Sequence, residues 1–229
     1  MIRVVLFDID GTLIDIQGVG RRALERAWYE LYGIEAGAES IDFGGRTDES
    51  LFEELYRCHG VAQTVEKHHQ LLAVYSHLLC DYLSRLQRDC LPGAHELVLG
   101  LLKQAPDARV GLLTGNARLA AEIKLRHYGL WSAFSFGAFG DEDSCRSALA
   151  RMASERAARC LQSEIRPEEI LVIGDTLHDI RCAQSIEAQC LAVATGGVSQ
   201  FQLRKAKADA VVRDLRAVNV AAVVAGFRD

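Results

Sequence analysis

The chain has 229 residues, 49% of them hydrophobic and 25% charged, which is typical of a globular protein with a sizeable core. Its 26 basic and 31 acidic residues give a formal net charge of −5, which argues against a nucleic-acid groove and gives no reason to expect a membrane partner. No apolar run approaches the ~18 residues of a membrane span. The seven cysteines are scattered, without a CxxC pair, and favour buried free thiols in a cytoplasmic protein.

Short, continuously apolar runs predict buried strands in four places, with a weaker fifth. These runs are Arg3–Ile9, Arg109–Leu113, Ile170–Ile173, Cys190–Ala194 and the weaker Ala210–Val212. Helical patterns follow at Ala94–Lys103, Asn116–Tyr128, Ser147–Leu161 and His178–Glu187. Buried strands that alternate with helices predict an α/β fold, with a parallel sheet covered on both faces.

The segment between about Gly18 and Arg88 breaks this alternation, because it shows helical stripes and no strand pattern. Gly18 and Gly20 stand at the first crossing and Pro92-Gly93 at the second, and such residues are typical of linkers and hinges. We therefore predict a core domain over residues 1–17 and 89–229, and a helical domain over residues 18–88, inserted after the first strand.

The first strand ends in DIDGT, which places Asp8 and Asp10 side by side. This segment is not an EF-hand loop, because its glycine stands fourth instead of sixth and Val19 occupies the position of the last acidic ligand. A surface turn remains one interpretation. A carboxylate nucleophile with a neighbouring acid/base is the other, since ligands of open α/β sheets bind beyond the carboxyl ends of the strands.

Two further strand candidates also end in polar residues. Thr114 ends one of them, and Asp175 and Asp179 follow another. Chance surface turns at three strand ends are a poor explanation for this pattern. Four carboxylates at one edge would repel one another unless a divalent cation neutralised them, and oxygen ligands point to Mg²⁺.

Three segments in this order, DIDGT (8–12), LLTGN (112–116) and GDTLHD (174–179), resemble the signature of the haloacid dehalogenase-like hydrolases. The position of the insert resembles the members with a C1 cap, in particular the phosphoglycolate-phosphatase-like group. The resemblance covers essentially the whole chain. It is specific for the superfamily and weakly informative about the substrate. It implies a Rossmann-like core with an inserted all-helical cap.

The resemblance also implies roles for individual residues. Asp8 would attack phosphorus, and Asp10 would protonate the leaving group and then activate water. Thr114, Gly115 and Asn116 would hold the phosphoryl oxygens at a helix start. Mg²⁺ would be held by ligands that we expect to be Asp8, Asp10 through its backbone carbonyl, Asp175 and Asp179.

The family places a cation, usually lysine, ahead of the strand that ends in GDT. This chain departs from that pattern, because residues 137–157 contain no lysine. We expect Arg146 to take the role, since a guanidinium can bridge carboxylate and phosphate. Lys124 is the alternative, but it follows Thr114 by ten residues, or ~15 Å along a helix. The alternative interpretation of Arg146 is an ordinary surface charge at the start of a helix.

The insert contains FGGRTDES at residues 43–50, which resembles the specificity loop of C1 caps. Arg46 could bind a carboxylate or second phosphate of the substrate. The same segment also predicts a helix start, with Thr47 as N-cap and Asp48 and Glu49 in the first turn. Both interpretations can hold together.

These observations favour a Mg²⁺-dependent phosphatase of a small phosphomonoester, with phosphoglycolate as the candidate that the resemblance suggests. The first alternative is a phosphomutase of the β-phosphoglucomutase type, which would return the phosphoryl group to a sugar. The second is a receiver-like phospho-acceptor domain, against which Asp10 and the insert argue. The sequence carries no signal for a particular ester or for an oligomeric state.

Overall fold

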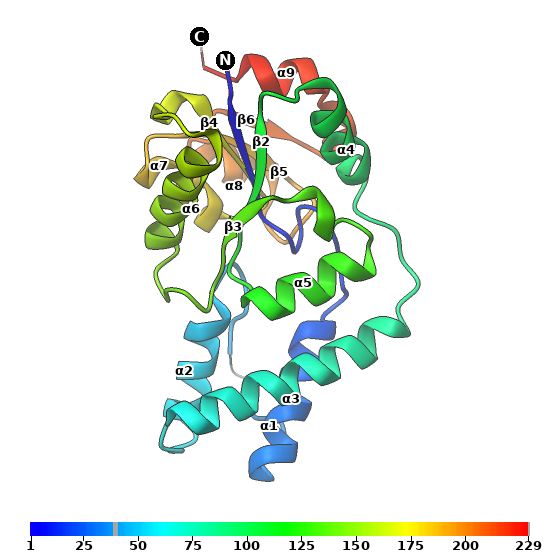
Figure 1. Cartoon of the computed structure of the whole chain (residues 1–229). Helices are drawn as coiled ribbons and strands as arrows, with labels where there is room; N and C mark the ends of the chain where they lie inside the picture. The colour runs from blue at the N-terminus through cyan, green and yellow to red at the C-terminus, as the bar shows by residue number, and fades with distance from the viewer. Residues whose placement is uncertain (39–40, 229) are drawn as a thin grey trace.

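The computed structural model describes residues 1–38 and 41–228. Its centre is a parallel sheet of six strands in the spatial order β3-β2-β1-β4-β5-β6 (Figure 1). The strands are β1 Val4–Phe7, β2 Arg109–Leu113, β3 Phe136–Ala138, β4 Ile170–Gly174, β5 Gln189–Val193 and β6 Ala210–Val212. The expected α/β fold with a parallel sheet is therefore confirmed.

Helices cover both faces of the sheet. Side chains alternate between the two faces along each strand, so apolar strands present an apolar surface on each face. In β1, Val5 and Phe7 pack into one apolar cluster, and Val4 and Leu6 pack into another. The helices of this core are α4 Ala94–Gln104, α5 Arg118–His127, α6 Arg146–Leu161, α7 Leu177–Ser185, α8 Gln200–Lys205 and α9 Val220–Ala225. Short 3-10 helices are Trp131–Ala133, Pro167–Glu169 and Leu215–Ala217.

Three helices between β1 and α4 lie together beyond the carboxyl ends of the strands (Figure 1). They are α1 Val19–Tyr32, α2 Asp48–Cys58 and α3 Val65–Ser84. The helix α1 buries one apolar face, including Leu24 and Trp28, and packs against α3. The helix α3 also packs against α5 of the core. The insert therefore stands over the edge of the sheet where the polar residues collect.

The structure corrects several details of the sequence analysis, and most element bounds shift by one or two residues. The three-residue strand β3 had no recognisable apolar run. The helix α5 begins at Arg118 instead of Asn116. Arg146 is the first residue of α6, which was expected to begin one residue later. All seven cysteines are free, but four of them are exposed and not buried as expected.

Within the described residues, we find no helix that is both long and apolar enough to span a membrane.

Candidate active site

The carboxyl ends of three adjacent strands carry polar side chains. Asp8 and Asp10 follow β1. Thr114 follows β2, and Asp175 follows β4. Because β1 lies between β2 and β4, the sheet topology brings these strand ends together. The backbone N–H of Asp8 still donates to the carbonyl of Ile173, 2.9 Å away, so the main chain of Asp8 is anchored to the sheet.

Asp8, Asp175 and Asp179 form a buried carboxylate cluster. One oxygen of each carboxylate lies within 4.8 Å of one oxygen of each of the others. Oxygen ligands in such an arrangement suit a hard divalent cation such as Mg²⁺. The donor set therefore fits the metal that the resemblance implies.

Asp175 is held against the loop that follows β1. The hydroxyl of Thr12 donates to Oδ1 of Asp175 over 3.1 Å. Gly11 has a φ of 78°, and a Cβ atom there would collide with the Asp175 carboxylate. A Cβ atom at Gly196 would also collide with this carboxylate. Glycine is thus required at both positions, by close approach at each and by the left-handed backbone at Gly11.

Asp179 is fixed by α7 and by Arg146. Its Oδ2 accepts hydrogen bonds from the backbone N–H of Thr176, at 2.9 Å, and from the Thr176 hydroxyl, at 2.6 Å. Its Oδ1 accepts from Nη2 of Arg146 at 2.6 Å, and the same nitrogen lies 3.7 Å from Oδ1 of Asp8. Arg146 is 8% exposed, so the alternative interpretation of this residue as a surface charge is wrong.

Burial and repulsion between the charges raise the pKa of two of these carboxyl groups. Burial, followed by repulsion from Asp179, raises the pKa of Asp8 to about 7. Burial and the charges of Asp179 and Asp8 raise the pKa of Asp175 to about 8. With its pKa raised to about 7, Asp8 is only partly ionised at neutral pH in the absence of a metal. A bound divalent cation would favour its ionised form.

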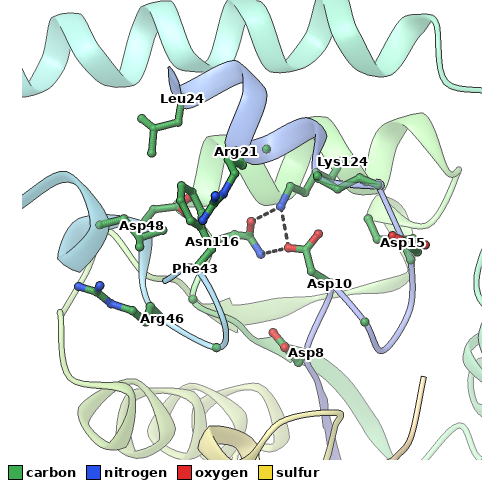
Figure 2. Close-up of a pocket in the computed structure, with 18 of the residues that line it drawn as sticks. Asp8, Asp10, Asp15, Arg21, Leu24, Phe43, Arg46, Asp48, Asn116 and Lys124 are labelled. Atoms are coloured by element: carbon green, nitrogen blue, oxygen red, sulfur yellow. Dashed lines mark hydrogen bonds and ion pairs between the residues drawn. The ribbon is translucent and has the colours of Figure 1, made fainter. Parts of the chain in front are cut away.

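The ammonium group of Lys124 reaches the same site, contrary to the distance argument made from the sequence. Its Nζ lies 2.6 Å from Oδ2 of Asp10 and 2.5 Å from Oδ1 of Asn116 (Figure 2). The expected separation was wrong because α5 begins only at Arg118, and because long side chains on a helix lean toward its N-terminus. Arg146 and Lys124 therefore contact different carboxylates, Asp8 and Asp10.

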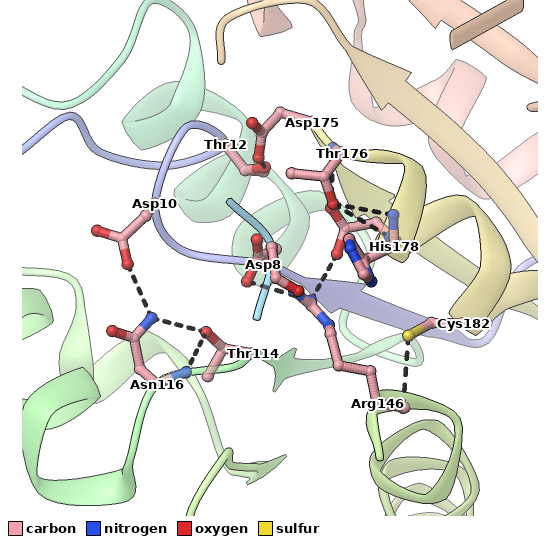
Figure 3. A network of polar contacts seen from close by, with 12 residues as sticks. Asp8, Asp10, Thr12, Thr114, Asn116, Arg146, Asp175, Thr176, His178 and Cys182 are labelled. Carbon is pink, nitrogen blue, oxygen red and sulfur yellow. Dashed lines mark hydrogen bonds and ion pairs between the residues drawn. The ribbon is translucent and has the colours of Figure 1, made fainter. Parts of the chain in front are cut away.

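The loop between β2 and α5 carries the three residues expected to bind phosphate. Asn116 donates from Nδ2 to the Thr114 hydroxyl at 2.9 Å and to Oδ2 of Asp10 at 2.8 Å (Figure 3). The backbone N–H of Asn116 also donates to the Thr114 hydroxyl, over 3.2 Å. Gly115 lies against the insert, because a Cβ atom there would collide with the backbone carbonyl of Arg46.

Arg46 belongs to the wall of the site, but its guanidinium is engaged elsewhere. It pairs with the carboxylate of Glu54 and donates to the carbonyl of Ser50 at 3.0 Å. Figure 2 shows this guanidinium turned away from Asp8 and Asp10. The helix start predicted here is confirmed, because the Thr47 hydroxyl accepts from the backbone N–H of Ser50.

Asp48 is a residue whose role the sequence did not reveal. Its Oδ2 accepts from the backbone N–H of Ala117 at 2.7 Å, and its own N–H donates to the carbonyl of Gly115, also at 2.7 Å. Burial raises the pKa of Asp48 to about 6, although the charge of Lys124 opposes the shift. The acidic position at a helix start was the available signal, and it suggested only an interaction with the helix dipole.

A cavity of about 330 Å³ lies between the sheet edge and the insert (Figure 2). Asp8, Asp10 and Lys124 line its core side. The insert adds a mostly apolar wall, which includes Leu24, Phe43, Leu51 and Tyr75. The size and the combination of apolar walls with a few charged groups fit a small-molecule site.

A family model described as a haloacid dehalogenase-like hydrolase matches residues 2–186. The chain belongs to the haloacid dehalogenase-like hydrolases. It is therefore an enzyme of the hydrolase class, and the resemblance inferred from three short motifs is confirmed.

Curated and solved relatives agree with this family. The pyrophosphatase PpaX of Oceanobacillus iheyensis is 23% identical over 227 residues, which cover 94% of each chain. The structure of CbbY from Rhodobacter sphaeroides in complex with phosphate superimposes with a TM-score of 0.75 at 18% identity, covering 96% of this chain and 98% of that one. A β-phosphoglucomutase from Clostridium difficile gives a TM-score of 0.72 at 18% identity, covering 96% and 95%. At these identities, the solved structures support the fold alone.

Proposed function

We propose that this hydrolase is a Mg²⁺-dependent phosphatase that cleaves a small phosphomonoester through an aspartyl-phosphate intermediate. The observation that carries the proposal is the buried cluster of Asp8, Asp175 and Asp179, of which Asp8 lines the cavity together with Asp10. Mg²⁺ held by this cluster, with the Asp10 backbone carbonyl, would keep Asp8 ionised and offset the charge of the phosphoryl group.

In the first step, a carboxylate oxygen of Asp8 attacks phosphorus and the ester P–O bond breaks. The electron pair of that bond leaves with the alcohol oxygen, which takes a proton from Asp10. Thr114 and the amide groups of Gly115 and Asn116 would hold the phosphoryl oxygens. Arg146 lies 3.7 Å from the Asp8 carboxylate and would steady both nucleophile and phosphate.

In the second step, Asp10 takes a proton from water, and the resulting hydroxide attacks the phosphorus of the aspartyl phosphate. The bond between phosphorus and the Asp8 oxygen breaks, inorganic phosphate forms, and the Asp8 carboxylate is restored. The proton that Asp10 gave to the alcohol in the first step is thus replaced from water in the second. Both steps need Asp10 beside the nucleophile, as the end of β1 provides.

We assign residues 18–88 to a lid and residues 1–17 and 89–229 to the catalytic core. The contacts of Asp48 and Arg46 with the loop after β2 support this assignment, because they join the insert to the core beside the cavity. Such a lid would exclude water during the first step and open for release of the products. A cytoplasmic location and a substrate of the phosphoglycolate kind belong to the same proposal.

The test is phosphate release from a panel of small phosphomonoesters, including phosphoglycolate, with Mg²⁺ or with EDTA. Turnover that needs Mg²⁺ and disappears in Asp8→Asn supports the proposal, and the preferred ester names the substrate class. Phosphate release by Asp8→Asn at the wild-type rate would overturn it. Transfer of the phosphoryl group between sugar positions without net phosphate release would instead favour the mutase.

A further inference from the structure

Lys124 is a buried lysine whose position the proposed steps leave unexplained. Its side chain is 5% exposed, although it stands on α5 at the boundary between core and insert. Burying an ammonium group is costly unless its protons are hydrogen-bonded. Two acceptors meet that need, Oδ2 of Asp10 at 2.6 Å and Oδ1 of Asn116 at 2.5 Å.

The Asp10 side chain is 40% exposed, so packing alone does not fix its rotamer. Its hydrogen bonds do so instead. Oδ2 accepts from both Lys124 and the side-chain amide of Asn116 (Figure 2). Oδ1 is shielded from solvent and has no hydrogen-bond partner among the residues that the structure describes. The two oxygens therefore differ, because Oδ2 is held by two donors and Oδ1 by none in the part of the chain that the structure describes.

We propose that Lys124 is the positioning residue of Asp10, holding Oδ2 so that Oδ1 exchanges protons with the leaving group and with water. Asn116 completes the arrangement, because it accepts from Lys124 and donates to the same Asp10 oxygen. The inference rests on the proposed function, in which Asp10 is the acid/base.

Two other roles are open to a lysine at this position, and each makes a different prediction. Lys124 lines the cavity, so it could bind the substrate directly, and its loss would then raise KM for every ester. Its charge also acts on Asp48 of the insert, so it could serve the docking of the lid. A positioning role predicts instead that Lys124 variants share the kinetic signature of Asp10 variants.

That signature follows from the two steps. The leaving group of p-nitrophenyl phosphate departs without a proton, so the first step does not need Asp10, whereas hydrolysis of the aspartyl phosphate does. An enzyme with a misplaced Asp10 should therefore release about one equivalent of p-nitrophenol in a burst and then turn over slowly. With an alkyl phosphate, the first step itself becomes slow and no burst appears.

The experiment compares Lys124→Met, Asp10→Asn and the double variant by stopped-flow kinetics with Mg²⁺. We expect a p-nitrophenol burst in both single variants, followed by a kcat lowered by about 100-fold for Lys124→Met. KM for p-nitrophenyl phosphate should fall together with kcat, because hydrolysis of the aspartyl phosphate then limits turnover, and kcat/KM should change little. The double variant should be no slower than Asp10→Asn. Lys124→Arg keeps a donor and should recover part of the rate.

Arg126→Met is the matched control, since Arg126 is an exposed cation on the same helix and pairs only with Glu122 among the described residues. It should behave as wild type. If Lys124→Met does not fold, the comparison is made with Lys124→Gln. A raised KM without a burst would overturn the inference while leaving the proposed function intact. Wild-type turnover by Asp8→Asn would overturn the proposed function itself.

Discussion

The Asp48 carboxylate of the insert accepts a hydrogen bond of 2.7 Å from the backbone N–H of Ala117, at the start of α5. The backbone N–H of Asp48 donates in turn to Gly115. The insert thus contacts the loop that carries Thr114 and Asn116 through two directed hydrogen bonds. Cavity closure and the geometry of that loop therefore depend on the same residue.

Asp48→Ala should weaken the docking of the insert, because it leaves the N–H of Ala117 without its partner. The cost of such a buried unsatisfied donor is about 1–3 kcal/mol. We expect faster proteolysis and hydrogen exchange over residues 43–50, together with a lower kcat/KM. Asp48→Asn, which retains an acceptor oxygen, is the matched control. Equal exchange rates in wild type and Asp48→Ala would contradict this prediction.

Docking should also depend on pH through Asp48. Burial raises the pKa of this carboxyl from 3.8 to about 6, so the docked state binds a proton more tightly than an exposed Asp48 does. The stabilisation is therefore fully present below pH ~4 and is lost as the pH rises through about 6. Hydrogen exchange over residues 43–50, corrected for its intrinsic pH dependence, should increase between pH 5 and 7. That increase should be absent in Asp48→Asn, and an identical increase there would assign it to other groups.

Asp8→Asn should make the metal-free protein more stable while removing its activity. The raised pKa of Asp8, about 7, means that its ionised form destabilises the metal-free fold above that pH. At pH 8 the variant should gain on the order of 2 kcal/mol, or roughly 4–8 °C in Tm, a gain that shrinks toward pH 5. Calorimetry in EDTA measures this. Asp15→Asn, at an exposed position in the same loop, should leave Tm nearly unchanged.

Binding of Mg²⁺ should release protons and weaken as the pH falls. Asp8 and Asp175 have pKa values raised to about 7 and about 8, so protons occupy ligand oxygens near neutral pH. Below the pKa of a ligand, each proton that Mg²⁺ must displace lowers the apparent affinity for Mg²⁺ by about tenfold for every unit by which the pH falls. Titration calorimetry in buffers of different ionisation enthalpy should detect this release between pH 6 and 8. Affinity independent of pH over that range would argue that other groups bind the cation.

Arg146→Ala should destabilise the fold by about 3–5 kcal/mol, because it leaves Asp179 buried without its cationic partner. Arg146→Lys keeps the charge and restores the residue type usual in the family. A lysine has no second nitrogen with which to reach the carbonyl of Gly45, which Nη1 of Arg146 contacts at 3.0 Å. We therefore expect a stable Lys variant with reduced kcat/KM. Thermal melts and steady-state kinetics separate the two effects.

The sequence by itself determined the sheet and the line of carboxylates along its edge. Strands β1, β2 and β4 were predictable because buried parallel strands are continuous apolar runs, and their register carries Asp8 and Asp175 to a common edge. The short strand β3 was not predictable, since three residues containing a glycine give no periodic signal. Three dispersed motifs were sufficient to indicate the family.

Only the tertiary structure decided which side chains meet within the site. Lys124 contacts Asp10 because of where α5 begins and which way its side chain leans, and neither can be read from spacing. Arg46 is turned to Glu54, and Asp48 to Ala117, by contacts between segments far apart in the chain. Local patterns record burial and backbone preference, whereas the partner of a buried charge is fixed by packing in three dimensions.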